Sequence, residues 1–321
     1  MEGKGMKYTL IFLLLLSIQS TVSVAQELEV YALRSFYFSD TEKVGFVSLT
    51  DRYQWETSVI SKENLGDTVF EGDNYHELSL AYRNRFLSTV KISEEDQVFV
   101  HNLLLDSTMV FPVRSLRLVA HLSAYGTSNP VEQEEYHIGF ELNEDQISLK
   151  EMGDYYSNTF INIGKENPFR TGQTHAIAWE ETEVRTTLPH IDLTEYQAAV
   201  LAEFRYDSTI AFECRMIGLS YYVQNLIRDD QVIGRHLIVQ EHKMHSVVFQ
   251  KIYLDTEGTY LLPLNFPEEG REPINYQWTG NLFNDRGPCL FGFLGNSFGC
   301  PDIDFLDEDK PSIYIQCDNR H

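Results

Sequence analysis

One stretch of the chain decides the expected fold: Asp106-Ser107-Thr108-Met109-Val110-Phe111-Pro112-Val113-Arg114. Apolar residues occupy every second position from Met109 to Val113. Successive side chains of a β-strand point to opposite faces of a sheet, so this alternation predicts a strand with one buried face. The Asp-Ser-Thr start is typical of a turn that opens a strand, because Asp and Ser side chains bond nearby backbone groups. A ligand-binding role for these three residues is the alternative.

The second half of the chain repeats this pattern in Asp207-Ser208-Thr209-Ile210-Ala211-Phe212-Glu213-Cys214-Arg215. Both stretches share D-S-T, an apolar residue, F and R at the same spacing. Further matches follow in the same order on both sides, among them His76 with His175, Leu118 with Leu219, and His137 with His236. In both copies the apolar phase then slips by one residue, as at a β-bulge or at a bend where a strand crosses between sheets. The ordered matches predict an internal duplication.

Short alternating stretches recur along the chain, and few segments show the 3.6-residue apolar repeat of a helix. We therefore expect an all-β fold with two tandem units that are β-sandwich-like or jelly-roll-like. The first unit spans 26–146, the second spans 147–266, and a C-terminal segment, 267–321, lies outside the repeat. Residues 192–205 are rich in helix formers, but their counterpart reads as a strand, so the duplication predicts a strand here as well.

The first 25 residues have the features of a signal peptide. The apolar run Tyr8–Leu16 is too short to span a bilayer comfortably, and small residues end the segment at Val22-Ser23-Val24-Ala25. No cysteine follows the expected cleavage site, which argues against a lipoprotein. No later stretch is long and apolar enough to span a bilayer. The sequence predicts an exported protein, periplasmic or extracellular, that does not span the membrane.

The chain is strongly acidic, with 48 Asp and Glu against 25 Lys and Arg and a formal net charge of −23. Such a surface repels nucleic acid and anionic lipid, so neither is an expected partner. A protein or a glycan remains as the partner.

The four cysteines are Cys214, Cys289, Cys300 and Cys317. An even number in an oxidising compartment predicts two disulfides, and four cysteines allow three pairings. We expect Cys289 to pair with Cys300, which would close a short loop. Pairing Cys214 with Cys317 would then hold the last strand against the second unit.

The acidic run near the C-terminus offers a candidate calcium site at Asp302, Asp304 and Asp307. Calcium takes six to eight oxygen ligands, which clustered carboxylates can supply. The run lacks the glycine and the final glutamate of an EF-hand loop. The alternative is a solvated acidic loop in an acidic protein.

The loop between Cys289 and Cys300 carries three phenylalanines, Phe291, Phe293 and Phe298. Rigid, exposed aromatic side chains would form a binding surface for a protein or a glycan. The alternative is that they complete the core, since large apolar side chains are usually buried.

No nucleophile, metal or phosphate-binding motif is present, and no catalytic residue is assigned. The expected function is therefore a non-catalytic binding or structural role. The alternative is a carbohydrate-active hydrolase, in which Trp179 or Trp278 would be a sugar platform beside an acidic pair. Glycoside cleavage requires two carboxylates about 5–10 Å apart. Three glutamates lie close to Trp179 in the sequence: Glu180, Glu181 and Glu183.

Overall fold

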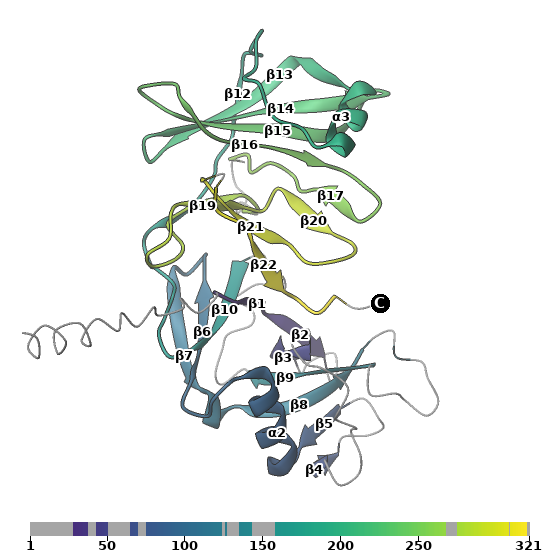
Figure 1. The fold of residues 1–321 in the computed structure, drawn as a ribbon, viewed down its shortest axis with the longest axis vertical. Helices are drawn as coiled ribbons and strands as arrows, with labels where there is room; N and C mark the ends of the chain where they lie inside the picture. The colour runs from purple at the N-terminus through teal and green to yellow at the C-terminus, as the bar shows by residue number, and fades with distance from the viewer. Residues whose placement is uncertain are drawn as a thin grey trace, which may run out of the picture.

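The computed structural model describes residues 28–37, 43–50, 65–69, 75–123, 126, 135–142, 158–267, 275–307 and 309–319. The expected signal peptide, residues 1–25, lies outside the described residues. Three main sheets follow one another along the long axis of the molecule (Figure 1). The described residues contain only two α-helices, α2 (Leu80–Val90) and α3 (Glu195–Ala202). The all-β class predicted from the sequence is confirmed.

A nine-stranded sheet forms the middle of the molecule. Its strands in spatial order are β11 (Thr174–Ala176), β18 (Trp278–Gly280), β19 (Cys289–Phe291), β21 (Asp302–Phe305), β22 (Ile313–Gln316), β1 (Val30–Ala32), β10 (Thr159–Gly164), β6 (Gln97–Asn102) and β7 (Ser107–Pro112). Neighbours are antiparallel except β1 and β22, which are parallel. This sheet takes strands from all three expected segments of the chain.

The other sheets lie on either side of the nine-stranded sheet. A six-stranded sheet contains β2 (Arg34–Tyr37), β3 (Lys43–Ser48), β9 (Tyr136–Leu142), β8 (Arg117–Leu122), β5 (Tyr75–Leu78) and β4 (Leu65–Val69). A five-stranded sheet contains β12 (Glu180–Thr182), β13 (Arg205–Met216), β14 (Leu219–Arg228), β15 (Gln231–Glu241) and β16 (Val247–Leu254). A two-stranded sheet contains β17 (Thr259–Leu261) and β20 (Leu294–Asn296).

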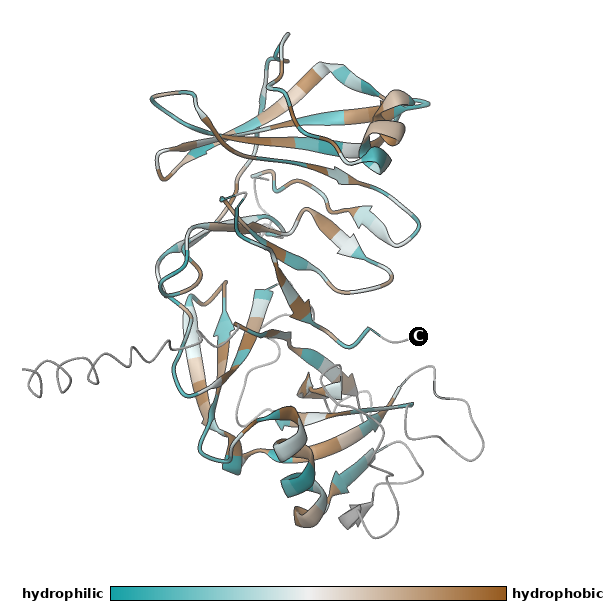
Figure 2. Ribbon diagram, in the orientation of Figure 1, coloured by the Kyte–Doolittle hydropathy of each residue, from teal (hydrophilic) through white to brown (hydrophobic). Residues whose placement is uncertain are grey.

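Apolar side chains fill the space between these sheets. One core cluster joins the six-stranded sheet, α2 and one face of the nine-stranded sheet, through residues such as Phe86, Phe140 and Ile161. Another joins the five-stranded sheet to the C-terminal segment, through residues such as Val223, Leu290 and Phe293. Figure 2 shows hydrophobic and hydrophilic residues alternating along the strands of the five-stranded sheet. This is the pattern expected of strands with one face on a core.

The structure does not confirm the internal duplication. Strands β7 and β8 belong to different sheets and are separated by the 3₁₀ turn η4 (Val113–Ser115). Their counterparts by sequence, β13 and β14, are neighbours in one sheet. The local turn chemistry is nevertheless present in both places. Asp106 has the left-handed backbone of a turn residue, with φ of 44°. The Asp207 carboxylate accepts hydrogen bonds from Thr209 N (2.8 Å) and Oγ1 (2.6 Å), at a register shift in β13.

The prediction of a strand over 192–205 is wrong, because most of this segment forms α3. Thr194 and Gln197 form a capping box: Gln197 N donates to Thr194 Oγ1 (3.2 Å), and Thr194 N donates to Gln197 Oε1 (3.1 Å). This cap satisfies backbone N–H groups that a helix start leaves unpaired. The capping box and the helix propensity of these residues decide the structure here. The strand expected from the similarity of this segment to β6 does not form.

The predicted disulfides are also wrong. Cys300 bonds to Cys317, with their Cα atoms 5.6 Å apart, while Cys214 and Cys289 are free and buried. The reason is the antiparallel pairing of β21 with β22, which brings Cys300, two residues before β21, close to Cys317, the residue after β22. Cys289 instead pairs across from Phe305, at the other end of β21. The disulfide fits an exported protein. Among the described residues, no helix is long and apolar enough to cross a membrane.

We expect one disulfide and two protected thiols in the folded protein. Burial raises the pKa of the Cys289 thiol to about 12, which suppresses its reactive thiolate form. Alkylation followed by peptide mapping should label Cys214 and Cys289 only after denaturation, and should recover a Cys300–Cys317 cross-link. Replacing both Cys300 and Cys317 by Ala should lower the free energy of unfolding by about 3 kcal/mol, for a loop of 17 residues. A cross-linked peptide containing Cys289 would contradict this assignment.

Candidate functional site

The structure places Trp179 in the core, where it cannot be a sugar platform. Its side chain is 1% exposed and meets Phe293 edge-to-face, with ring centroids 6.1 Å apart. Glu180 and Glu181 are consecutive residues of strand β12, so their side chains point to opposite faces of the sheet. An acidic pair beside an open Trp179 ring is therefore not assembled.

Two of the three phenylalanines predicted as site residues are also buried. Phe291 packs edge-to-face on Phe160 with ring centroids 5.1 Å apart, and Phe293 stacks on Tyr253 at 4.7 Å. Only Phe298 is exposed, at 58%. The loop therefore contributes mainly to the core, which is the alternative that the sequence left open.

The acidic run does not gather its three aspartates around a common point. Asp304 accepts hydrogen bonds from Lys251 Nζ (2.7 and 2.8 Å), from Tyr253 Oη (3.1 Å) and from Ser312 Oγ (2.7 Å). Asp302 lies on the surface, and Asp307 pairs with Lys310 at 3.1 Å. Within the described ranges, no three His, Cys, Asp or Glu side chains are placed to hold a metal ion. Lysine ammonium groups therefore neutralise two of the three carboxylates.

The hydrogen bonds to Asp304 predict that this residue stabilises the fold, and that replacing it lowers the free energy of unfolding by a measurable amount. Burial raises the pKa of Tyr253 well above its usual range, so its hydroxyl remains a neutral donor to Asp304. Asp304→Ala would leave Lys251, Tyr253 and Ser312 without this acceptor and should lower the free energy of unfolding by about 2–4 kcal/mol. Chemical denaturation measures this change. Calcium or a chelator should leave the unfolding midpoint unchanged, and a calcium-dependent rise that Asp304→Ala abolishes would contradict this reading.

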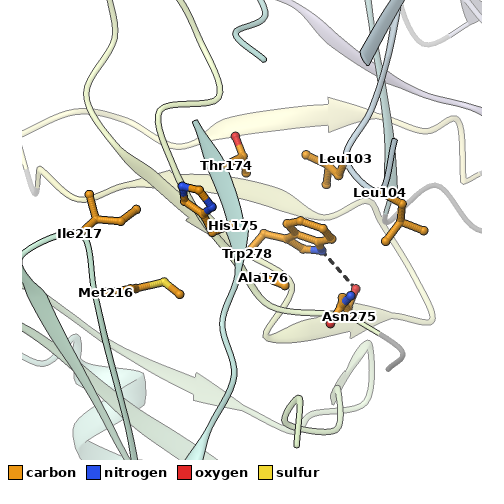
Figure 3. A pocket seen from close by; sticks show the side chains of 9 residues that line it. All are labelled: Leu103, Leu104, Thr174, His175, Ala176, Met216, Ile217, Asn275 and Trp278. Carbon is orange, nitrogen blue, oxygen red and sulfur yellow. Dashed lines mark hydrogen bonds between the residues drawn. The ribbon is translucent and has the colours of Figure 1, made fainter. Parts of the chain in front are cut away.

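Trp278, another predicted site residue, lines a cavity. The cavity has a volume of about 630 Å³ and lies beside strand β11 (Figure 3). We call it the Trp278 groove. Its lining residues come from four segments that are distant in the sequence: Leu103, Leu104, Thr174, His175, Ala176, Met216, Ile217, Asn275 and Trp278.

The first wall is the turn between β6 and β7. The Asn102 side chain fixes it, because its Oδ1 accepts from Leu105 N (2.8 Å) and its Nδ2 donates to Thr159 Oγ1 (3.0 Å). Leu103 N donates to Asn158 O at 2.9 Å. These bonds hold the backbone of the turn in place. Leu104 and Leu105 remain 46% and 48% exposed to solvent.

The second wall is the two-residue turn between β13 and β14. Both central residues have positive φ, 51° at Ile217 and 76° at Gly218, which matches the twist of a hairpin. Glycine adopts this conformation freely, but a β-branched residue does so at a cost of about 1–3 kcal/mol. Ile217 is also 57% exposed. A strained, exposed isoleucine is of the kind that marks functional sites.

The third wall is strand β11, and Trp278 beside it forms the floor of the groove. Trp278 is 5% exposed and donates from Nε1 to Asn275 O at 3.1 Å. Ala176 lies directly across from Trp278 in the ladder between β11 and β18. The hydroxyl oxygen of Thr174 is buried and has no hydrogen-bond partner in the described structure. The groove thus has an apolar floor with a few polar groups along one side.

The buried residue His101 belongs to β6, the strand that leads into the first wall. His101 is completely buried, its Nδ1 lies 2.9 Å from Thr108 Oγ1, and its ring stacks on Phe169 with centroids 5.1 Å apart. Burial lowers the pKa of His101 to about 4. The ring is therefore neutral in the folded protein at neutral pH.

This burial predicts that the protein is sensitive to acid. Below the ordinary histidine pKa of 6.5, the unfolded chain binds a proton at residue 101 and the folded chain does not. His101 therefore contributes fully above pH 6.5, and between pH 6.5 and 4 its contribution falls by up to about 3 kcal/mol. Urea denaturation from pH 7.5 to 4.5 should show a flatter profile for His101→Gln than for the natural protein. The exposed control, His190→Gln, should retain the natural profile; an unchanged profile in His101→Gln would refute the assignment.

The sequence identified only Trp278 among the residues that line the groove. The run Leu103-Leu104-Leu105 immediately before the Asp106 turn was an available signal, since three leucines at a turn cannot all be buried easily. Nothing in the sequence indicated that the Met216–Ile217 turn would lie near them.

Comparisons with protein-family models, with curated proteins and with solved structures found no match. The functional conclusion therefore rests on the geometry of the groove.

Proposed function

We propose that this protein is an exported, non-catalytic binding protein whose Trp278 groove holds apolar side chains of a polypeptide partner. The observation that carries this proposal is the clustering of exposed aliphatic residues at one cavity. Leu104 and Ile217 both line the groove and both are about half exposed. Exposed apolar groups that gather at a concave site typically mark an interaction surface.

The size of the cavity supports a binding role. Ligand pockets commonly have volumes of about 300–1,000 Å³, an apolar lining and a few polar groups that fix orientation. The Trp278 groove, at about 630 Å³, combines leucine, methionine and tryptophan with Thr174, His175 and Asn275. This arrangement can hold one or two large apolar side chains and can direct adjoining polar groups.

The chemistry favours a polypeptide over a glycan. A sugar ring stacks on an open aromatic face, and Trp278 is only 5% exposed. The exposed rim is aliphatic instead, which suits apolar side chains. The net charge of −23 favours a partner segment that carries basic residues near its apolar ones. No observation favours the hydrolase alternative.

Peptide selection tests this function. The protein without residues 1–25 is screened against a random heptapeptide library, and the dissociation constants of enriched peptides are measured by calorimetry. We expect enriched peptides to carry large apolar residues together with Lys or Arg. Leu104→Asp and Ile217→Asp should each weaken their binding at least tenfold, because a buried carboxylate would face apolar groups.

Leu80→Asp is the matched control, since Leu80 is 70% exposed at the start of α2 and does not line the groove. It should leave affinity unchanged. Peptides that bind equally well to Leu104→Asp, Ile217→Asp and the natural protein would rule out the groove as the binding site.

A further inference from the structure

Strand β11 is the outermost strand of the nine-stranded sheet on the side of the groove. It pairs with β18, and on its other side no strand of the described structure pairs with it. The register places Thr174 across from Gly280, His175 across from Thr279 and Ala176 across from Trp278. An edge of this kind presents backbone donors and acceptors that can bond to another chain.

The register shows which backbone groups point outward. Two hydrogen bonds flank the ladder: Asn281 N donates to Gln173 O, and Ile177 N donates to Gln277 O, both at 2.9 Å. In an antiparallel pair, residues whose backbone groups face the partner alternate with residues whose groups face away. Residues 173, 175 and 177 therefore face β18, and the N–H and C=O of Thr174 and Ala176 point away from it.

These outward groups lie in the Trp278 groove. Thr174 and Ala176 are both among its lining residues, and among the described residues neither makes a backbone hydrogen bond on its outward side. The Thr174 hydroxyl oxygen beside them is buried and has no partner either. Edge strands are commonly protected by Lys, Pro or a bulge, and residues 173–177 carry neither Lys nor Pro and pair without a register shift.

We propose that the partner segment binds as an added β-strand along β11, with backbone hydrogen bonds to Thr174 and Ala176 and one apolar side chain inserted between Leu104 and Ile217. The inference rests on the proposed function and specifies its binding mode. Only an extended polypeptide supplies alternating donors and acceptors at the spacing of a strand, so the backbone chemistry selects the class of partner. The short edge limits the bound segment to a few residues.

The partner's side chains follow from the same geometry. Successive side chains of an added strand point to opposite faces, so apolar residues should alternate with polar ones. Basic residues at the polar positions would complement the acidic chain, which carries 48 acidic residues. We therefore expect alternating apolar and basic residues in the peptides that the library screen enriches.

Proline substitutions at the outward positions test the added strand directly. Proline lacks the N–H, and its fixed φ is tolerated at an edge strand where that N–H faces away from the sheet. Thr174→Pro and Ala176→Pro should preserve the His175 bonds to β18 and weaken binding of the enriched heptapeptides at least tenfold. Leu80→Pro is the control, because proline is tolerated at the first residue of a helix and Leu80 does not line the groove; this variant should bind within about twofold of the natural protein.

Amide exchange supplies a second readout that needs no variant. On saturation with an enriched heptapeptide, the backbone amides of Thr174 and Ala176 should exchange at least tenfold more slowly, measured residue by residue by NMR. If a proline variant fails to fold, this measurement decides the question.

The outcomes separate the two proposals. Loss of binding in both Leu104→Asp and the proline variants, with slowed exchange at Thr174 and Ala176, supports strand addition. Loss of binding only in Leu104→Asp, with unchanged exchange, overturns strand addition and leaves the proposed function standing. Binding that Leu104→Asp does not weaken overturns the proposed function itself, and strand addition at the groove with it.

Discussion

The parallel pairing of β1 with β22 holds the molecule together. Val30 lies across from Ile315 in this ladder, which joins two groups of strands into one nine-stranded sheet. One group comes from the first half of the chain together with β10, and the other comes from β11 and the C-terminal segment. Just after β22, Asp318 is buried, and its Oδ2 lies 2.5 Å from Ser48 Oγ and 2.6 Å from His137 Nδ1. The C-terminal strand is thus anchored on both the nine-stranded and the six-stranded sheets.

The groove depends on this pairing, because its walls belong to both groups of strands. Leu103 and Leu104 follow β6, whereas Thr174 and Trp278 belong to β11 and β18. The five-stranded sheet adds the strained turn at Ile217. The groove keeps its shape only if the β6–β7 turn, the β13–β14 turn and the β11 edge are all held rigidly. The Asn102 side chain provides part of that rigidity, because it fixes the backbone of the turn between β6 and β7.

The proposed function and binding mode follow from one physical feature, which is an open strand edge beside an apolar cavity. Each alone is common on protein surfaces. Together they offer a polypeptide both main-chain hydrogen bonds, which are insensitive to sequence, and a pocket that selects a side chain. In this proposal, the acidic composition of the chain adds long-range attraction for basic segments of the partner. The buried aromatic residues Trp179, Phe291 and Phe293 belong to the hydrophobic core clusters and contribute to stability.

Alternation depends only on neighbouring residues, so it is visible in the sequence without knowledge of the fold. Strand β9 is an example, because apolar residues occupy every second position from Tyr136 to Leu142. The same local chemistry also led to a prediction that the structure does not confirm. The similar residues at Asp106 and Asp207 suggested an internal duplication. Sheet membership depends on contacts between distant segments, and those contacts differ between the two stretches.

By itself, the sequence determined the β class, the acidic composition and the turns at Asp residues. These properties follow from side-chain chemistry and from the two-residue period of a strand. Only the tertiary structure decided which cysteines pair, which strand is left at a sheet edge, and which apolar residues surround Trp278. Each of these depends on distances between residues that are far apart along the chain, such as Leu104 and Ile217, and a single sequence does not contain those distances.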